Sequence, residues 1–218
     1  MWKKLGILLS CLVILNIPSL AFAGPEEVKT VTRTEKKVSV ECPQLTGGDK
    51  AVSNKINAAM SSKVASYVSE AATLGGGTVH YDVHKCDASL LSLTIVMTPK
   101  QGVEESTGMT FDRKTGSLRP ISYYYKEEEL LNRAADGLKY LYDIDSAKVK
   151  TAPDTYYVDS DNNIIGIYHA GAVLDKNEGE IEVNLSAADP VIVKTNPTPP
   201  PAYTGSGNKG TITGTEVR

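Results

Sequence analysis

The chain has 218 residues, of which 41% are hydrophobic and 22% are charged, and its formal net charge is −3. This is the composition of an ordinary globular protein, which excludes wholesale disorder, a polytopic membrane protein and a collagen-like fibre. Because the chain has no excess of basic residues to displace counterions from phosphates, the composition also argues against general nucleic-acid binding.

The first 23 residues have the layout of a cleaved secretory signal. A short basic start (residues 1–4) precedes a mostly apolar run, and Ala21-Phe22-Ala23 places small residues before Gly24. We expect cleavage between Ala23 and Gly24, and export to the periplasm, the envelope or the medium. An uncleaved membrane anchor and a lipid anchor on Cys11 are the alternatives. Cleavage leaves a net charge of about −5 and no later stretch that is apolar enough to span a membrane.

Cys42 and Cys86 are the only cysteines beyond this signal. An even number of cysteines in an oxidising compartment favours a disulfide between them. In the chain-entropy model, closing a loop of about 44 residues stabilises the fold by roughly 4 kcal/mol. Two buried thiols or a metal pair are the alternatives.

The first half of the chain after the signal predicts three strands and a helix. Residues 28–42 are predicted to form a strand, because apolar and polar residues alternate in them. Residues 49–72 have apolar residues at helical spacing behind a capping Asp49, and a run of three glycines ends the helix at residues 75–77. Residues 78–85 and 90–98 are predicted to form two further strands.

The second half predicts hairpins around another helix. The helix carries three glutamates in its first turn, where the helix dipole favours negative charge. The predicted strands of this half are 111–113, 117–121, 155–158, 164–168 and 181–185, and the predicted helix is 126–142.

These elements predict an α+β fold, with mainly antiparallel sheets and two main helices packed against them. We expect one domain over residues 24–194, with halves at about 24–100 and 101–194. Residues 195–218 form a tail rich in proline, glycine and threonine, for which the composition predicts disorder with local polyproline character.

Three segments resemble one family of secreted bacterial domains. They are Val-Ser-Val-Glu-Cys-Pro-Gln-Leu-Thr-Gly with the later Ile56-Asn57, Phe-Asp-Arg-Lys-Thr-Gly-Ser-Leu from Phe111, and Tyr-Tyr-Val-Asp-Ser-Asp-Asn-Asn from Tyr156 followed by Gly-Glu-Ile-Glu-Val. In order and spacing they resemble a pair of domains of unknown function. These paired domains form the extracellular part of the anti-sigma factor RsiV and also lie beside the catalytic domain of the peptidoglycan deacetylase PdaC. The loops at 100–108 and 169–179 depart from that pattern, so the resemblance does not identify a partner.

Two histidines and an aspartate share one face of the strand predicted at 78–85. His80, Asp82 and His84 are too far apart along a strand for both histidines to bind one metal ion, so we expect a solvated polar face. Asp159 begins a segment similar to a calcium loop, but Ile164 and Ala170 stand where that loop needs glycine and glutamate. A hairpin turn is the better interpretation, and we expect neither a metal nor a cofactor.

Tyrosine is used more than the other aromatic residues, with 11 Tyr against two Phe and one Trp. Its flat apolar ring and polar tip suit wet binding surfaces. We predict a recognition surface at the densest groups, which are Tyr123, Tyr124 and Tyr125 together with Tyr156 and Tyr157.

Two functions remain open. The first is a non-catalytic recognition or sensor-type domain that binds an exported protein or a peptidoglycan-type glycan. The alternative is a secreted hydrolase that acts on cell-wall glycan with a carboxylate site drawn from Asp82, Glu104, Glu105 and Asp112.

Overall fold

The computed structural model describes residues 27–186. The predicted signal with its cleavage site at Ala23–Gly24 and the tail 195–218 lie outside the described residues. In chain order the elements are β1 (Glu27–Glu35), β2 (Val38–Thr46), α1 (Lys50–Thr73), β3 (Gly77–Cys86), β4 (Leu90–Pro99), β5 (Glu105–Asp112), η1 (Ile121–Tyr123), α2 (Glu127–Tyr142), η2 (Ser146–Lys148), β6 (Thr155–Val158), β7 (Ile164–Tyr168), η3 (Lys176–Glu178) and β8 (Ile181–Asn184).

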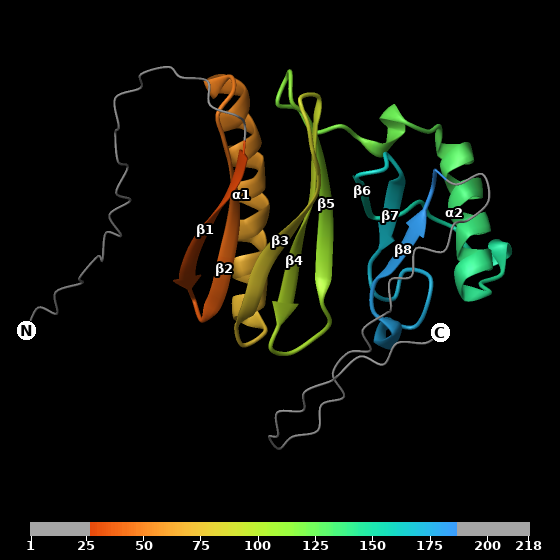
Figure 1. Cartoon of the computed structure of the whole chain (residues 1–218). Helices are drawn as coiled ribbons and strands as arrows, with labels where there is room; N and C mark the ends of the chain where they lie inside the picture. The colour runs from red at the N-terminus through yellow and green to blue at the C-terminus, as the bar shows by residue number, and fades with distance from the viewer. Residues whose placement is uncertain (1–26, 187–218) are drawn as a thin grey trace, which may run out of the picture.

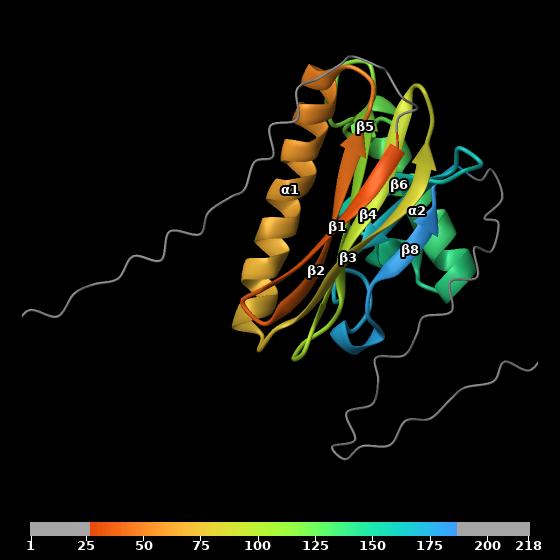
Figure 2. The ribbon, with the colours of Figure 1, turned by 60° about the vertical axis from the view of Figure 1, so that its left-hand side comes forward.

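The elements form four layers, in the order helix, sheet, sheet, helix (Figures 1 and 2). A five-stranded sheet has the order β1-β2-β3-β4-β5, and a three-stranded sheet has the order β6-β7-β8. Helix α1 covers one face of the first sheet, β6 packs against β4 and β5 on its other face, and α2 packs against β8. All strand pairs are antiparallel except β2 and β3, which are parallel and joined through α1. This arrangement confirms the α+β class.

Helix α1 forms the main core with the five-stranded sheet. The Asp49 side chain accepts hydrogen bonds from the amides of Ala51 and Val52, at 2.8 and 3.0 Å, and so satisfies two amides that the first turn leaves unpaired. The residues that α1 buries recur every three or four positions, which puts them on one face. They are Ser53, Ile56, Met60, Val64, Tyr67, Val68 and Ala71.

The strand predicted at residues 28–42 is in fact a hairpin of β1 and β2. Its two-residue turn is Lys36-Lys37, with φ of 50° and 68°. Positive φ at both central residues is the geometry that matches the twist of paired strands, and it is usually supplied by Asn-Gly or Asp-Gly. Two lysines in these positions do not indicate a turn. The alternating apolar and polar residues of β1 and β2 therefore predicted one continuous strand.

Strand β5 is longer than predicted, since the sequence indicated a strand only from residue 111. All eight residues of β5 pair with β4, so the first sheet continues past residue 101. Met109 and Phe111 face α1, whereas Ser106 and Thr110 are buried on the opposite face. Because the residues on this buried face are small and polar, the sequence of β5 lacks the alternation of apolar and polar residues by which a strand is predicted.

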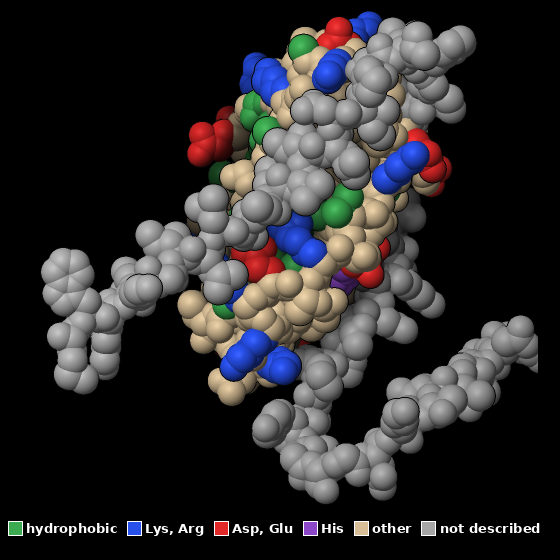
Figure 3. All heavy atoms as spheres, turned by 90° about the vertical axis from the view of Figure 1, so that its left-hand side faces the viewer, with side chains coloured by type: hydrophobic (Ala, Val, Ile, Leu, Met, Phe, Trp, Pro, Cys, Tyr) green, Lys and Arg blue, Asp and Glu red, His purple; other side chains and the backbone are tan. Residues whose placement is uncertain are grey.

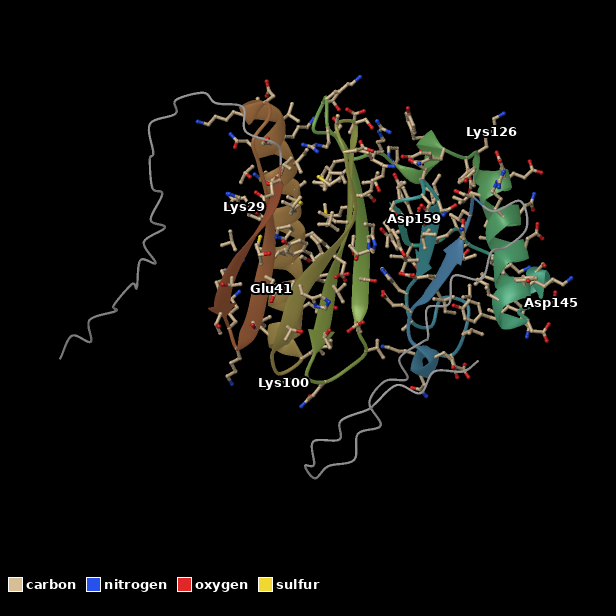
Figure 4. All side chains as sticks on the ribbon, in the orientation of Figure 1. Lys29, Glu41, Lys100, Lys126, Asp145 and Asp159 are labelled. Atoms are coloured by element: carbon tan, nitrogen blue, oxygen red, sulfur yellow. The ribbon has the colours of Figure 1, made fainter. Side chains whose placement is uncertain are left out.

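The charges are mixed on the face that Figure 3 shows, where basic and acidic side chains alternate over the described atoms. In the described part of the chain, no helix has the length and the apolar character needed to cross a bilayer. Lys126, which precedes α2, and Asp145, which caps η2, lie on the outer side of the three-stranded sheet (Figure 4).

Candidate functional site

A groove of about 540 Å³ lies where β5 and β6 meet. Its lining comes from Gly108 and Thr110 of β5, from residues 118–121, and from residues 153–156. Strand β6 supplies one wall, and the segment that leaves β5 toward η1 supplies the other. The groove is therefore built by the joint between the two sheets.

Gly108 sets how closely the two sheets approach at this joint. A Cβ atom on Gly108 would lie 2.0 Å from the carbonyl oxygen of Tyr156, well inside any real contact. Next to it, the Thr155 hydroxyl donates a hydrogen bond to the Gly108 carbonyl at 2.9 Å. Farther along, the Ser92 hydroxyl accepts a hydrogen bond from the Val158 amide at 2.7 Å. The floor of the groove is thus a contact between backbones that only glycine permits.

A row of tyrosine rings runs from Tyr156, which lines the groove, toward η1. Tyr124 meets Tyr156 edge to face at 5.9 Å, and Tyr123 meets Tyr124 in the same way at 5.1 Å. The Arg119 guanidinium lies over the Tyr123 ring at 5.0 Å. Tyr123 is 65% exposed and Leu118 is 50% exposed, so both offer apolar surface to solvent.

The five tyrosines predicted as a recognition surface do not share one surface. Tyr123, Tyr124 and Tyr156 form the connected row beside the groove, and Tyr156 itself is buried. Tyr125 packs under the Arg133 guanidinium at 4.8 Å. Tyr157 points the other way along β6, where it is buried between the sheets and stacks on His84 at 3.7 Å. Alternation along a strand separates the two neighbours.

The polar side chains of the groove are mostly satisfied inside the protein. Arg119 forms an ion pair with Asp112 at 2.7 Å, which holds the pKa of Asp112 down, at about 2. Asp154 accepts a hydrogen bond from the His169 amide at 2.9 Å. The Tyr156 hydroxyl donates to the Arg119 carbonyl at 2.5 Å, and the desolvation of that ring raises the tyrosine's pKa. The groove therefore offers ring faces and aliphatic surface more than unengaged polar groups.

A second cluster, which the sequence did not indicate, ties the loop between β7 and β8 to β5. Glu180 accepts hydrogen bonds from the Ser106 amide, at 2.7 Å, and from the Ser106 hydroxyl. Nε2 of His169 lies 3.0 Å from the Ser106 carbonyl oxygen and 3.8 Å from the Glu180 carboxylate. Desolvation raises the pKa of Glu180 to about 7. The three residues are distant in sequence and follow no motif.

The cluster contains the kind of hydrogen bond that can activate a serine, because the Ser106 hydroxyl donates to the Glu180 carboxyl. The Ser106 side chain is buried, so its hydroxyl is not open to a substrate, and Nε2 of His169 is engaged with the Ser106 carbonyl. The cluster fastens the loop to the sheet.

The four carboxylates proposed for a hydrolytic site have separate contacts. Asp112 caps the turn after β5 by accepting from two backbone amides, and Glu105 accepts from the Tyr67 hydroxyl at 3.2 Å. These two residues lie seven positions apart on one strand, or roughly 24 Å, whereas paired catalytic carboxylates are about 5 to 10 Å apart. Glu104 accepts from Thr98, and Asp82 lies 4.0 Å from His80 at the surface.

The predicted disulfide between Cys42 and Cys86 is not present, and both thiols are free. The parallel register of β2 and β3 pairs Val40 with Val79. Continued, it would place Cys42 beside Tyr81, five residues before Cys86, or roughly 16 Å away at strand spacing. Disulfides need Cα atoms within about 7 Å. Cys42 is instead buried under α1, and Cys86 is exposed at the end of β3.

The histidines on β3 are also apart from one another. His84 bonds to the Thr94 hydroxyl at 3.0 Å, and its burial lowers its pKa. Asp159 accepts from the amides of Asp161 and Asn163, which confirms the predicted hairpin turn. Within residues 27–186, no three His, Cys, Asp or Glu side chains are arranged to hold a metal ion.

Comparison with known proteins finds solved structures with a similar fold. No family model matches the chain, and no curated protein matches it. A solved DUF3298 family member from Bacteroides fragilis superposes with a TM-score of 0.54 at 12% identity, over 74% of this chain and 90% of that one. A DUF3298 family protein from Pseudomonas aeruginosa superposes with a TM-score of 0.50 at 10% identity, over 75% and 91%.

Identities this low show likeness of fold alone. The resemblance to the domains of RsiV and PdaC stays a prediction, because neither comparison involves those proteins. What the superpositions establish is that this chain has a fold found in bacterial DUF3298 proteins.

Proposed function

We propose that this chain is a secreted or cell-envelope recognition domain, without catalytic activity, that binds an extended and largely apolar segment of an exported protein. The observation that carries the proposal is the groove between β5 and β6, where exposed Tyr123 and Leu118 flank a lining whose polar groups are already engaged. Ligand sites of this kind combine apolar and aromatic walls with a few orienting polar groups.

The chemistry of the lining favours a protein segment over a glycan. A sugar presents many hydroxyls, each of which needs a polar partner when it is removed from water. The Arg119 and Asp154 side chains, which could serve, already bind Asp112 and the His169 amide. Ring faces and prolines suit apolar side chains better. The glycan, which the sequence left open beside an exported protein, therefore becomes an outcome of the test.

The test compares two tyrosines that are similarly exposed. Isotope-labelled chain is titrated with proline-rich peptides and, separately, with muropeptides, while the amide resonances of the non-proline residues in 118–123 are followed. Tyr123→Ala should weaken peptide binding about tenfold, as loss of a central aromatic contact does. Tyr140→Ala, on α2 and 59% exposed, should leave it unchanged.

Two results would overturn the proposal. Saturable binding of muropeptides at residues 118–123, with no binding of peptides, would replace the protein ligand by a glycan. Equal effects of the two substitutions would remove the groove as the binding site.

A further inference from the structure

We propose that the groove binds the proline-rich segment of this same chain, residues 197–203, so that the domain carries its own competing ligand. The inference rests on the proposed function, because it assigns an occupant to the same groove. The segment reads Pro-Thr-Pro-Pro-Pro-Ala-Tyr and lies outside the described residues.

The chemistry of the segment matches that of the groove. Polyproline helices have no internal hydrogen bonds and keep their backbone solvated, so they dock through ring faces against aromatic-lined grooves. The exposed Tyr123 ring beside the groove supplies such a surface, and Leu118, Pro120 and Pro153 of the lining add apolar surface. The groove has few unengaged polar groups. A ligand whose side chains form no hydrogen bonds therefore leaves no polar group unpaired when it binds there.

The charge of the segment also fits. Four of the five residues 197–201 are proline, and residues 195–208 include no charged side chain. The groove can therefore take up this segment without desolvating a charge, which would be costly. The fixed φ of proline further reduces the conformational entropy that binding must remove.

The described chain ends beside the groove. The Ser186 hydroxyl lies 3.3 Å from the Tyr125 hydroxyl and accepts a hydrogen bond from the Ile164 amide. The Tyr125 amide in turn donates to the carbonyl of Ile121, which lines the groove, at 3.3 Å. Ser186 is therefore held close to the wall that the segment has to reach.

The residues between Ser186 and Pro197 are enough to reach the groove and few enough to keep the local concentration of the segment high. Eleven residue steps separate Ser186 from Pro197, and an extended chain spans roughly 3.3 Å a step, so the tether reaches about 36 Å. A short tether of this length gives an effective concentration on the order of 1 mM. An intrinsic Kd of about 1 mM would thus leave the groove half occupied by the chain's own segment. An external partner has to compete with it.

The experiment keeps the full chain and changes only the segment. Amide spectra of the wild-type chain are compared with those of a Pro199→Ser, Pro200→Ser, Pro201→Ser variant, and a synthetic peptide of residues 195–204 is then added to the variant. The substitutions should shift the resonances of residues 118–123, and the peptide should restore them saturably with a Kd of about 1 mM or tighter. Tyr123→Ala in the variant should weaken that binding, and Tyr140→Ala should not.

The outcomes separate this inference from the proposed function. If the substitutions leave residues 118–123 unshifted while poly-L-proline still binds there, the self-occupied groove is overturned and the recognition groove stands. If neither the peptide nor poly-L-proline binds, both are overturned. If the wild-type spectrum depends on protein concentration, the segment occupies the groove of a second copy, which overturns binding within one chain.

Discussion

Burial of the Glu180 carboxyl predicts that the protein loses stability as the pH rises through neutrality. The carboxyl side chain is 15% exposed, and desolvation raises its pKa from 4.5 to about 7. The protonated form is therefore favoured in the folded state. Its stabilising contribution is complete below pH 4.5, decreases as the pH rises, and is lost once the pH has passed about 7. Each unit of difference between the folded and unfolded pKa corresponds to about 1.4 kcal/mol, so the full effect is on the order of 3 kcal/mol.

The groups around Glu180 decide which substitution tests this effect. Ser106 donates two hydrogen bonds to the carboxylate, His169 lies 3.8 Å away, and Glu105 and Lys63 lie within electrostatic range. Glu180→Gln keeps an acceptor for the Ser106 amide and removes the titration.

The assay is urea unfolding at a series of pH values between 5 and 8. Titration of Glu180 should cost wild type about 2 to 3 kcal/mol of unfolding free energy over that interval, while His84, whose pKa is lowered by burial, acts in the opposite direction and equally in both proteins. In Glu180→Gln, the loss of unfolding free energy between pH 5 and 8 should be smaller than in wild type by about 2 to 3 kcal/mol. Glu178→Gln, on the exposed turn two residues earlier, should lose as much as wild type. Identical pH profiles for wild type and Glu180→Gln would refute the reasoning. If that variant does not fold, a carbon-13 titration of the wild-type carboxyl, with a midpoint near 4.5, would refute it as well.

Three further predictions concern the joint between the sheets, the helix cap and the thiols. Gly108→Ala should destabilise the fold by about 3 kcal/mol or more in urea unfolding, because its Cβ would clash with the Tyr156 carbonyl; a change below 0.5 kcal/mol would contradict the close approach. Asp49→Ala should cost about 1 kcal/mol by the same measurement, since α1 loses its cap; unchanged stability would contradict a capping role. Maleimide should modify Cys86 in the folded protein and Cys42 only in denaturant, as measured by mass spectrometry. The reaction should be faster at higher pH, because the thiolate is the reactive form and partial desolvation raises the pKa of the Cys86 thiol. A protein that resists labelling and is lighter by the mass of two hydrogens would show a disulfide and contradict this prediction.

Elements with a strong local signal could be predicted from the sequence. Helix α1 has a capping aspartate, a repeated apolar face and three terminal glycines, and it forms within one residue of the predicted range. Strands β6 and β7 form as predicted because the Asp159 turn is rich in residues that cap their own backbone. In these segments, local chemistry and tertiary packing favour the same structure.

The failures occur where tertiary packing decides. The Lys36-Lys37 turn has no turn residues, so its left-handed geometry results from pairing between β1 and β2. Strand β5 is buried on both sides, but the side that meets the second sheet is made of small polar residues, which suit a close approach of backbones. A sequence pattern reports polarity, and it does not report that a polar face is covered by another sheet.

Only part of the candidate site could be predicted from the sequence, because tertiary packing decides which of its residues come together. A run of tyrosines indicates aromatic surface, but only the strand register separates Tyr156, on the groove side, from Tyr157, between the sheets. The Ser106, His169 and Glu180 cluster joins residues up to 74 positions apart and had no signal at all. The cysteines gave a misleading signal, because their even number says nothing about the distance between neighbouring strands.

The groove and the joint between the sheets share their atoms, which links recognition to stability. Gly108 and Tyr156 form the floor of the groove and are also the point at which the two sheets touch. A ligand that packs on this floor contacts both sheets at once, and it can do so only while they remain joined. Because such a ligand binds the joined state and not the separated one, binding must stabilise the joint by mass action. Occupation of the groove and docking of the two sheets are therefore linked equilibria, and the proposed binding of residues 197–203 would add to the stability of the joint.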